Sequence, residues 1–283
     1  MTKILEINNL NKKYDKFQLK DVSFNLEEGA IMGLVGRNGA GKTTIIKSIM
    51  DLIKIDSGEI KVFGGALNKE AKENIGIVFD DGFFSEQYNA KQIGNILKNI
   101  YKNWDSGKYL GYLNKMGLPD DKLIKDFSRG MQMKLSFAIA VSHNPRLLIL
   151  DEPTSGLDPV FRNEILEMFL DFIQDERNSI LISSHITTDL EKIADYITFI
   201  DDGEIIFSKE KDDFIYSYGI CKCTLKDLYE IDRKYVVKYL KNSNYIDVII
   251  ENIEEFRKEY PNLVTEKMNI DDYMVIFTNG ENI

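Results

Sequence analysis

The sequence contains few of the residues that mark disulfide-rich or membrane-spanning proteins. Of its 283 residues, two are cysteine, five are proline and two are histidine. Cys221 and Cys223 form a C-x-C pair with no histidine nearby, and two ligands are too few for a four-coordinate zinc site, so we expect reduced thiols. No apolar run approaches the roughly 18 residues that a membrane span requires. The first residues lack the anatomy of a signal peptide, so we expect a cytoplasmic chain with no membrane span of its own.

The charge balance of the chain is acidic. Lys and Arg number 36 and Asp and Glu number 46, which gives a net charge of −10 and a pI of about 4.9. A protein that binds nucleic acid without sequence preference needs a basic face, so this balance argues against nucleic acid as a partner. Hydrophobic residues make up 43% of the chain, and its length fits one large domain or a medium domain with a smaller one.

A glycine-rich segment, Gly36–Thr44, reads GRNGAGKTT. It matches G-x-x-x-x-G-K-[ST], a loop whose backbone N–H groups surround phosphate oxygens at a helix N-terminus, where the helix dipole adds positive potential. Glycine permits the tight curl and the close approach of the backbone. Lys42 is placed to reach the β- and γ-phosphates, and the Thr43 hydroxyl to ligate Mg²⁺. The context is the one that the motif requires, because residues 30–35 predict a short buried strand and 43–53 a helix.

Strand and helix signals alternate along the first 208 residues. The predicted strands cover 4–7, 19–26, 31–35, 59–63, 75–79, 147–150, 179–183 and 196–200, and the predicted helices cover 43–53, most of 89–142, 159–174 and 187–193. This alternation implies a mainly parallel sheet with helices on both faces. The N-terminal strands predict an antiparallel β element beside that sheet.

From residue 209 onward the signals become shorter and more charged. The apolar residues of 236–240 suggest a helix, those of 246–250 suggest a strand, and a further helix ends just before Pro261. We therefore predict two parts, a domain over 1–208 and a small α+β accessory region over 209–283.

The apolar strand at 147–150 ends in two acids, Asp151 and Glu152. Side chains at the carboxyl edge of a parallel strand face the ligand crevice. Asp151 is therefore a candidate for holding Mg²⁺, directly or through water, and Glu152 for polarising an attacking water. Strands often end in acids, but the segment Pro153–Pro159 (PTSGLDP) that follows makes the combination specific.

With these segments in place, residues 2–208 resemble the nucleotide-binding subunit of an ABC transporter. Gly36–Thr44 corresponds to the Walker A loop, 127–132 (FSRGMQ) to the signature, 150–152 to Walker B with its catalytic glutamate, 155–158 to the D-loop and His185 to the switch histidine. The resemblance implies an α/β fold: a P-loop NTPase core with a mainly parallel sheet, an antiparallel β subdomain and a helical signature subdomain, followed by the C-terminal α+β appendage.

The resemblance also implies ATP and Mg²⁺ as cofactors and a role for each motif residue. Catalytic roles are implied for Lys42, Glu152 and His185. Nucleotide contacts are implied for Tyr14, Gly36, Arg37, Asn38, Gly39, Ala40, Gly41, Lys42, Thr43, Thr44, Ser128, Gly130 and Asp158, and metal contacts for Thr43, Asp151 and Asp80. Tyr14 would stack on adenine, and the alternative is an edge-strand tyrosine with no ligand.

In this family two nucleotide-binding subunits enclose two ATP molecules head to tail. By resemblance, each site would combine the Walker A loop of one chain with Ser128 and Gly130 of the other, in a homodimer or a heterodimer. A separately encoded transmembrane permease would be the partner, and it would hold the chain at the inner face of the cell membrane.

The chain departs from the family pattern in two motifs. In the signature, Arg129 replaces the first glycine and Met131 replaces the glutamine. Arg129 either adds positive charge near the opposing nucleotide or faces solvent. At the Q-loop position, where the family usually has glutamine, the chain has Asp80, followed by Asp81. A carboxylate there would repel γ-phosphate unless Mg²⁺ or a water intervenes, or unless Gln87 takes part after a loop shift.

The signature variant and the closing residues Met268–Met274 resemble those of ABC-2 type exporters, so the sequence predicts an ATP-hydrolysing subunit of an exporter. Two alternatives remain. A soluble ABC ATPase acting on ribosomes or DNA usually carries two ATPase cores or a long coiled coil, and neither is visible in the sequence. A module that holds ATP without turnover would not require Glu152 and His185.

Overall fold

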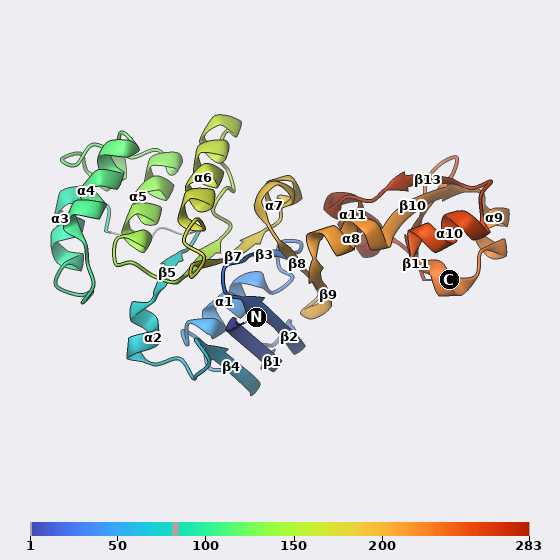
Figure 1. The fold of residues 1–283 in the computed structure, drawn as a ribbon, viewed down its shortest axis with the longest axis horizontal. Helices are drawn as coiled ribbons and strands as arrows, with labels where there is room; N and C mark the ends of the chain where they lie inside the picture. The colour runs from blue at the N-terminus through green and yellow to red at the C-terminus, as the bar shows by residue number, and fades with distance from the viewer. Residues whose placement is uncertain (1, 81–84, 283) are drawn as a thin grey trace. The chain divides into compact units, whose positions relative to one another are not determined.

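The computed structural model describes residues 2–80 and 85–282, which fall into two compact units (Figure 1). One comprises Met1–Ile186 and Thr198–Ser208, and we call it the large unit. The other comprises Thr187–Ile197 and Lys209–Ile283, and we call it the C-terminal unit. The short segment Thr187–Ile197 thus groups with the C-terminal unit, although it lies within the predicted 1–208 domain.

A six-stranded sheet with the order β5-β6-β7-β3-β8-β9 runs through the large unit. Its strands are β3 (Ile31–Val35), β5 (Ile75–Val78), β6 (Leu147–Asp151), β7 (Ser179–Ser184), β8 (Tyr196–Asp201) and β9 (Glu204–Glu210). β5 with β6, β6 with β7 and β7 with β3 run parallel. Every residue of β3, β6 and β7 is buried because both faces of these strands are covered, which explains their near-continuous apolar sequences. The predicted mainly parallel sheet is confirmed.

A separate antiparallel sheet has the order β2-β1-β4, formed by β1 (Lys3–Lys13), β2 (Gln18–Glu27) and β4 (Ser57–Val62). On β2, Leu19, Val22, Phe24 and Leu26 are buried while the residues between them are exposed. This alternation is typical of a sheet with one face in the core. The predicted antiparallel β element is confirmed.

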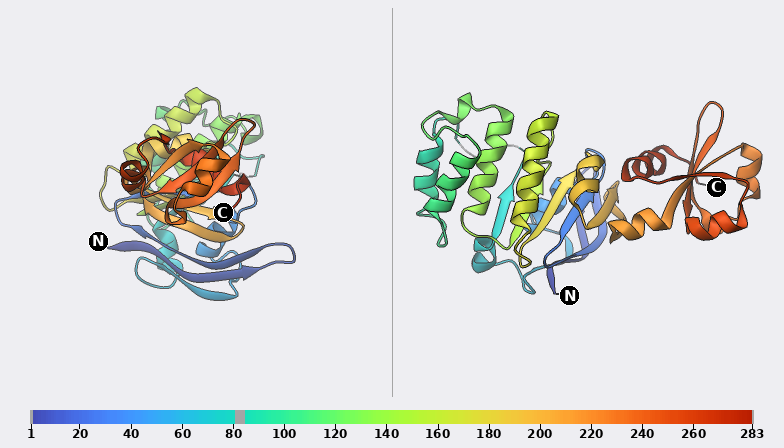
Figure 2. Two further views of the ribbon diagram at one scale, coloured as in Figure 1. Left: turned by 90° about the vertical axis from the view of Figure 1, so that its right-hand side faces the viewer. Right: turned by 45° about the horizontal axis from the view of Figure 1, so that its top comes forward.

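The helices of the large unit are α1 (Lys42–Ile49), α2 (Lys69–Glu73), α3 (Ala90–Leu97), α4 (Ser106–Lys115), α5 (Arg129–Val141) and α6 (Pro159–Phe172), with a 3-10 turn at Ile124–Asp126. α5 packs on β5 and α4 packs on α5. Figure 2 shows α3, α4 and α5 side by side, which gives the predicted helical subdomain. Within the described part of the chain, no helix combines the length and apolarity needed to cross a membrane.

The prediction of helix over almost all of 89–142 is wrong in part, because residues 98–105 and 116–128 are not α-helical. The breaks coincide with capping residues. Asn89, Asp105 and Ser128 each accept a hydrogen bond from a backbone N–H three residues on, at the starts of α3, α4 and α5. The periodic apolar residues of 89–142 did not reveal that three separate helices begin within this segment.

The C-terminal unit contains a four-stranded antiparallel sheet in the order β11-β12-β10-β13. Its elements are α7 (Thr187–Ile193), α8 (Lys211–Ser217), β10 (Tyr218–Cys223), α9 (Leu225–Glu230), a 3-10 turn (Arg233–Tyr235), β11 (Val236–Lys241), β12 (Ile246–Glu251), α10 (Ile253–Glu259), β13 (Val264–Lys267) and α11 (Ile270–Asn279). The run from β10 to β13 has the β-α-β-β-α-β order of the ferredoxin-like motif. α11 packs against β11, β12 and α7.

The helix predicted around residues 236–240 is wrong, since these residues form β11. Short apolar runs do not distinguish helix from strand by periodicity. Here the β-branched Val236 and Val237 favour a strand, and Tyr239 pairs with Val248 of the buried β12. The strand predicted at 246–250 and the helix predicted before Pro261 are confirmed.

We expect Tyr109→Phe to lower the free energy of unfolding by about 1 kcal/mol, the usual net contribution of one hydrogen bond. The Tyr109 hydroxyl donates to the Ala90 carbonyl oxygen at 2.8 Å inside the helical subdomain, and Tyr109 is 2% exposed. Tyr112→Phe is the matched control, because the Tyr112 hydroxyl makes no hydrogen bond within residues 2–80 and 85–282. Urea unfolding followed by circular dichroism measures both, and equal stabilities would contradict the assigned hydrogen bond.

Candidate functional site

The glycine-rich loop connects β3 to the start of α1. At Gly36 a Cβ would lie 2.4 Å from the Ile200 carbonyl oxygen, so the neighbouring backbone leaves no room for a side chain. Gly41 is the N-cap residue of α1 and has φ 117, a left-handed conformation that side chains disfavour. No side chain caps the helix at this position, which leaves the first N–H groups of α1 available to an anion.

A hollow opens at the carboxyl edge of the central sheet. Val35 of β3 pairs with Ser184 of β7, and Asp151 of β6 pairs with Ser183, so the segments that follow these parallel strands emerge side by side. The hollow is lined by Phe17, Asn38, Gly39, Gly41, Lys42, Thr43, Thr44, Asp80, Glu152, Ser155 and His185. All of these except Phe17 and Ser155 are residues that the sequence predicted for the site.

Both omitted residues had a signal in the sequence. Phe17 is an aromatic residue three positions after Tyr14, and its ring packs close to Gly41, where a Cβ would come within 2.8 Å of Cζ. Ser155 belongs to the D-loop segment, whose position was recognised without a role for this side chain.

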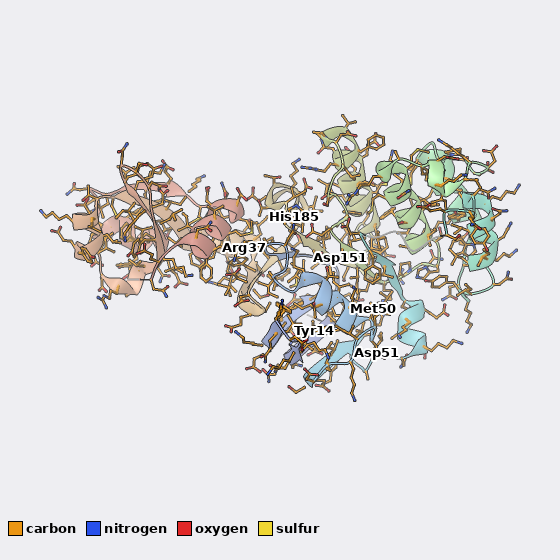
Figure 3. The ribbon with its side chains drawn as sticks, turned by 180° about the vertical axis from the view of Figure 1, so that it is seen from behind. Tyr14, Arg37, Met50, Asp51, Asp151 and His185 are labelled. Carbon is orange, nitrogen blue, oxygen red and sulfur yellow. The ribbon has the colours of Figure 1, made fainter. Side chains whose placement is uncertain are left out.

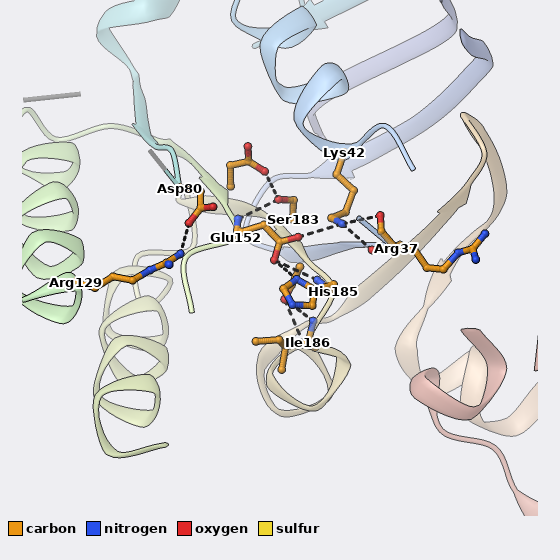
Figure 4. A network of polar contacts seen from close by, with 11 residues as sticks. Arg37, Lys42, Asp80, Arg129, Glu152, Ser183, His185 and Ile186 are labelled. Atoms are coloured by element: carbon orange, nitrogen blue, oxygen red, sulfur yellow. Dashed lines mark hydrogen bonds and ion pairs between the residues drawn. The ribbon is translucent and has the colours of Figure 1, made fainter. Parts of the chain in front are cut away.

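Glu152 lies between Lys42 and His185 (Figure 4). Its Oε1 is 3.0 Å from Lys42 Nζ, and its Oε2 is 2.7 Å from His185 Nδ1. Lys42 also donates hydrogen bonds to the carbonyl oxygens of Gly36 and Arg37, at 2.6 and 3.2 Å. Lys42 is 5% exposed and the Glu152 side chain 12%. A phosphate bound at the predicted loop would therefore compete with Glu152 for the Lys42 ammonium.

The backbone at Glu152 is held in an unusual conformation. Its φ is 50, in the left-handed region that residues other than glycine rarely adopt. Two interactions with β7 hold it there, since the Glu152 N–H donates to both the carbonyl and the hydroxyl oxygen of Ser183 at 3.1 Å. Strained positions of this kind cluster at functional sites.

Asp151 lies behind this network and is 3% exposed. Burial raises the pKa of the Asp151 carboxyl above its usual value, while hydrogen bonds from Ser183 and Thr43 act in the opposite direction. The Ser183 hydroxyl donates to Asp151 Oδ1 at 2.5 Å. A carboxylate and a threonine hydroxyl are oxygen ligands of the kind that Mg²⁺ prefers, with phosphates and waters completing the shell. The described residues contain no group of three or more His, Cys, Asp and Glu side chains that holds a metal by itself.

Three predicted residues of the loop region and the predicted adenine stacker lie outside the lining of the hollow. Gly36 and Ala40 are loop residues packed within the fold, and Arg37 Nη2 lies 3.4 Å from Asp201 Oδ1. Tyr14 follows β1, is 43% exposed, and has Lys12 Nζ 5.3 Å from its ring centre (Figure 3). Phe17, rather than Tyr14, is the aromatic residue on the wall of the hollow.

The predicted signature and D-loop residues also lie outside the hollow of their own chain. Ser128 caps α5 by accepting a hydrogen bond from the Met131 N–H at 3.3 Å. A Cβ at Gly130 would lie 3.2 Å from the Phe161 ring. Asp158 caps α6 by accepting hydrogen bonds from the Val160 and Phe161 N–H groups at 3.0 and 3.1 Å.

Asp80, at the predicted Q-loop position, lines the hollow and contacts Arg129. Asp80 Oδ1 accepts a hydrogen bond from Arg129 Nη2 at 2.5 Å (Figure 4). Arg129 therefore faces a carboxylate of its own chain. Asp81 lies outside the described residues, and Gln87 is exposed and is not among the residues that line the hollow.

A phosphate-binding loop with an acid beside its lysine, at the carboxyl edge of a parallel sheet, is the arrangement of P-loop nucleotide hydrolases. The chain belongs to the ABC transporter family, whose model matches residues 19–155. The ABC transporter ATP-binding protein YtrB of Bacillus subtilis (strain 168) is 36% identical over 205 residues, which cover 71% of this chain and 70% of YtrB. The chain is accordingly an ATP-binding and ATP-hydrolysing subunit.

Two further proteins are similar to this chain, the first in sequence and the second in fold. The lantibiotic transport ATP-binding protein SrtF of Streptococcus pyogenes is 38% identical over 212 residues, covering 74% of this chain and 92% of SrtF. The solved structure of cbiO1 from Clostridium perfringens, part of the ABC transporter complex cbiONQ, superimposes with a TM-score of 0.65 at 24% identity, covering 76% of this chain and 91% of that one. The second likeness shows a common fold and confirms the predicted fold class.

The contact between Lys42 and Glu152 predicts how nucleotide affinity responds to substitution. Glu152→Gln removes the charge that competes with phosphate for Lys42, so we expect Mg-ATP to bind as tightly as to the unchanged chain, or about 3- to 10-fold more tightly. Lys42→Ala should weaken binding by at least about tenfold, because a charge-assisted contact to phosphate is lost. Isothermal titration calorimetry measures both affinities.

The matched control for this experiment is Glu164→Gln. Glu164 Oε2 lies 2.5 Å from Lys134 Nζ, so it is also a glutamate paired with a buried lysine, but it is not among the residues that line the hollow. Its removal should leave ATP affinity unchanged. Weaker ATP binding by Glu152→Gln would show that Glu152 supports the nucleotide instead of competing with it.

Proposed function

We propose that the chain energises an exporter, as one subunit of an ATP-driven dimer bound to a separately encoded transmembrane permease. The support for a dimer is that Ser128 and Gly130 are not on the wall of the hollow in their own chain. Ser128 is exposed, and together with Gly130, which is buried in this chain, it would complete the site of a second copy or of a related subunit. Support for export comes from the signature variant and from SrtF, whose name concerns lantibiotic transport. The permease would hold the chain at the inner face of the membrane and would select the cargo.

In this proposal each residue of the site meets one part of Mg-ATP. The loop Gly36–Thr44 and the N-terminus of α1 surround the phosphates, and Lys42 meets their charge. Thr43 and Asp151 would hold Mg²⁺, which would supply positive charge beside the phosphates. Asp80, the third residue predicted to contact the metal, is paired with Arg129 at 2.5 Å and is left out of this shell. Tyr14 is proposed to stack on adenine. Phe17, which borders the hollow beside Gly41, is a second aromatic candidate for that role.

Hydrolysis is proposed as an in-line displacement at the γ-phosphorus. A water oxygen forms the new bond while the bond to the oxygen that bridges the β- and γ-phosphates breaks, and ADP leaves. Glu152 orients the water and accepts its proton, and His185 links that water to the γ-phosphate. Asp158 and the signature residues Ser128 and Gly130, all from the second subunit, would close the site.

The observation that carries catalysis, as opposed to mere ATP binding, is the position of Glu152. Its carboxylate is held 2.7 Å from His185 and 3.0 Å from Lys42 on the wall of the hollow. A module that only stores ATP has no use for a half-buried acid beside the phosphates, because the acid weakens binding by repulsion. The arrangement therefore favours turnover over a sensor or storage role.

We expect Glu152→Gln to lower the rate of ATP hydrolysis by about 10²- to 10⁴-fold, the usual loss when one positioned acid–base group is removed. The amide has nearly the same shape and is a poor base, so the fold and nucleotide binding should persist. Phosphate release under saturating Mg-ATP measures the rate, with Glu164→Gln as the control. Hydrolysis at the rate of the unchanged chain would remove Glu152 from the proposed role.

We expect the Glu152→Gln chain to be monomeric without nucleotide and dimeric with Mg-ATP, because each nucleotide then contacts two chains and is not consumed. Multi-angle light scattering measures the mass in both states. Adding Lys42→Ala to the same chain should abolish the dimer at equal ATP concentration. A dimer that forms equally well without ATP would identify a different interface. A chain that stays monomeric throughout would favour a heterodimer with a related subunit.

A further inference from the structure

Two of the three positions at which the chain departs from its family pattern, Asp80 and Arg129, contact each other. Asp80 follows β5 and lines the nucleotide hollow, and Arg129 is the first residue of α5. Their side chains meet at 2.5 Å, between Asp80 Oδ1 and Arg129 Nη2, although 49 positions separate them in the sequence. A glutamine and a glycine at these places would make no such ion pair, so the two departures belong together.

Arg129 also contacts a third segment. A Cβ built at Gly156 would lie 2.9 Å from Arg129 Nη1 and 3.0 Å from Cζ, so the guanidinium lies directly over this glycine. Gly156 has φ 70 and belongs to the D-loop that follows Glu152. Asp80, Arg129, Glu152 and Ser155 together line a narrow cleft beside the nucleotide hollow. The Arg129 side chain, at the start of α5, thus contacts both the segment after β5 and the segment after β6.

The charge of Asp80 requires a partner of this kind. Asp80 lies on the wall that receives the triphosphate, where an unpaired carboxylate would repel phosphate oxygens. The Arg129 guanidinium neutralises that charge from the side. The Arg129 and Asp80 side chains are 53% and 44% exposed, and ion pairs at such exposure contribute little to folding stability. The consequence of the pair therefore lies in ligand binding and not in the stability of the fold.

We propose that Arg129 is a positioning residue that neutralises Asp80 within its own chain, and that this pairing makes a carboxylate at the Q-loop position compatible with ATP. The proposal rests on ATP binding in the hollow described above. It differs from both sequence interpretations of Arg129, since the guanidinium serves its own chain and is not simply solvated. It also explains how the Asp80 carboxylate can lie near γ-phosphate, because Arg129 of the same chain supplies the opposite charge.

A double-mutant cycle in the full-length chain tests this coupling. Arg129→Gln should weaken ATP binding by about 3- to 10-fold, because Asp80 then faces the phosphates without its partner. Asp80→Asn should bind ATP at least as tightly as the unchanged chain. The double variant should return to within about twofold of the unchanged chain, because removal of Asp80 removes what Arg129 neutralises. Arg129→Lys keeps the charge and should retain most of the affinity.

The measurement is equilibrium ATP binding by calorimetry, in EDTA and in excess Mg²⁺, at two salt concentrations. The loss in Arg129→Gln should be greatest in EDTA at low salt, because Mg²⁺ and added ions both screen the Asp80 charge. A merely structural role would give a loss that Asp80→Asn does not repair. Circular dichroism spectra and melting temperatures of all variants establish that each is folded.

The matched control is the ion pair between Arg177 and Asp175, which joins the same types of side chain before β7, at the opposite edge of the sheet. Arg177→Gln and Asp175→Asn should leave ATP affinity unchanged. The proposal is overturned if Arg129→Gln keeps full affinity, or if its loss persists in the double variant. Absence of ATP binding by the unchanged chain would instead overturn the nucleotide site itself, so the two failures are distinguishable.

Discussion

The site depends on the parallel pairing of three buried strands, β6, β7 and β3. This pairing sets Asp151 beside Ser183 and Val35 beside Ser184, so the phosphate loop, the two acids and His185 begin at neighbouring points of one edge. A slip of one residue in a strand turns its side chains to the other face. Both faces of these strands are buried, so no alternation of polar and apolar residues sets the register. The polar groups at the carboxyl edge take their positions from the parallel strand pairs themselves.

The carboxyl edge of the sheet holds charged side chains that are almost fully buried. Lys42 and Asp151 are 5% and 3% exposed, and a buried ion without a partner is strongly unfavourable. The chain satisfies each of them internally: Lys42 has Glu152 and two loop carbonyls, and Asp151 has two hydroxyls. In the proposed site, Mg-ATP would offer the same kinds of partner, anionic oxygens for the lysine and a cation for the carboxylate. Binding would then be an exchange of partners at positions that the fold already provides.

Short sequence motifs predicted those parts of the molecule whose conformation depends on residues close together in the sequence. The glycine-rich loop and the strand ending in Asp151 and Glu152 each carry their own structural context, and the structure gathers them in one hollow. Phe17 was missed because its place on the wall depends on how the turn after β1 folds against Gly41. The pairing of Asp80 with Arg129 joins residues 49 positions apart, and no single-sequence pattern reports such a contact. The valine-rich β11 was misread as a helix because its pairing with β12, not its periodicity, determines the strand.

The segment after His185 has a consequence for how the protein is divided in the laboratory. α7 begins at Thr187, and its buried residues Leu190 and Ile193 belong to the C-terminal unit, where α7 packs on α11. Glu191 accepts hydrogen bonds from the Ile270 N–H at 2.9 Å and from Lys211 Nζ at 3.0 Å. A fragment that ends at residue 208 keeps every nucleotide motif but lacks α11, which packs on α7. α7 starts only two residues after His185. The short fragment and the whole chain are therefore not interchangeable reagents, even for assays that concern ATP alone.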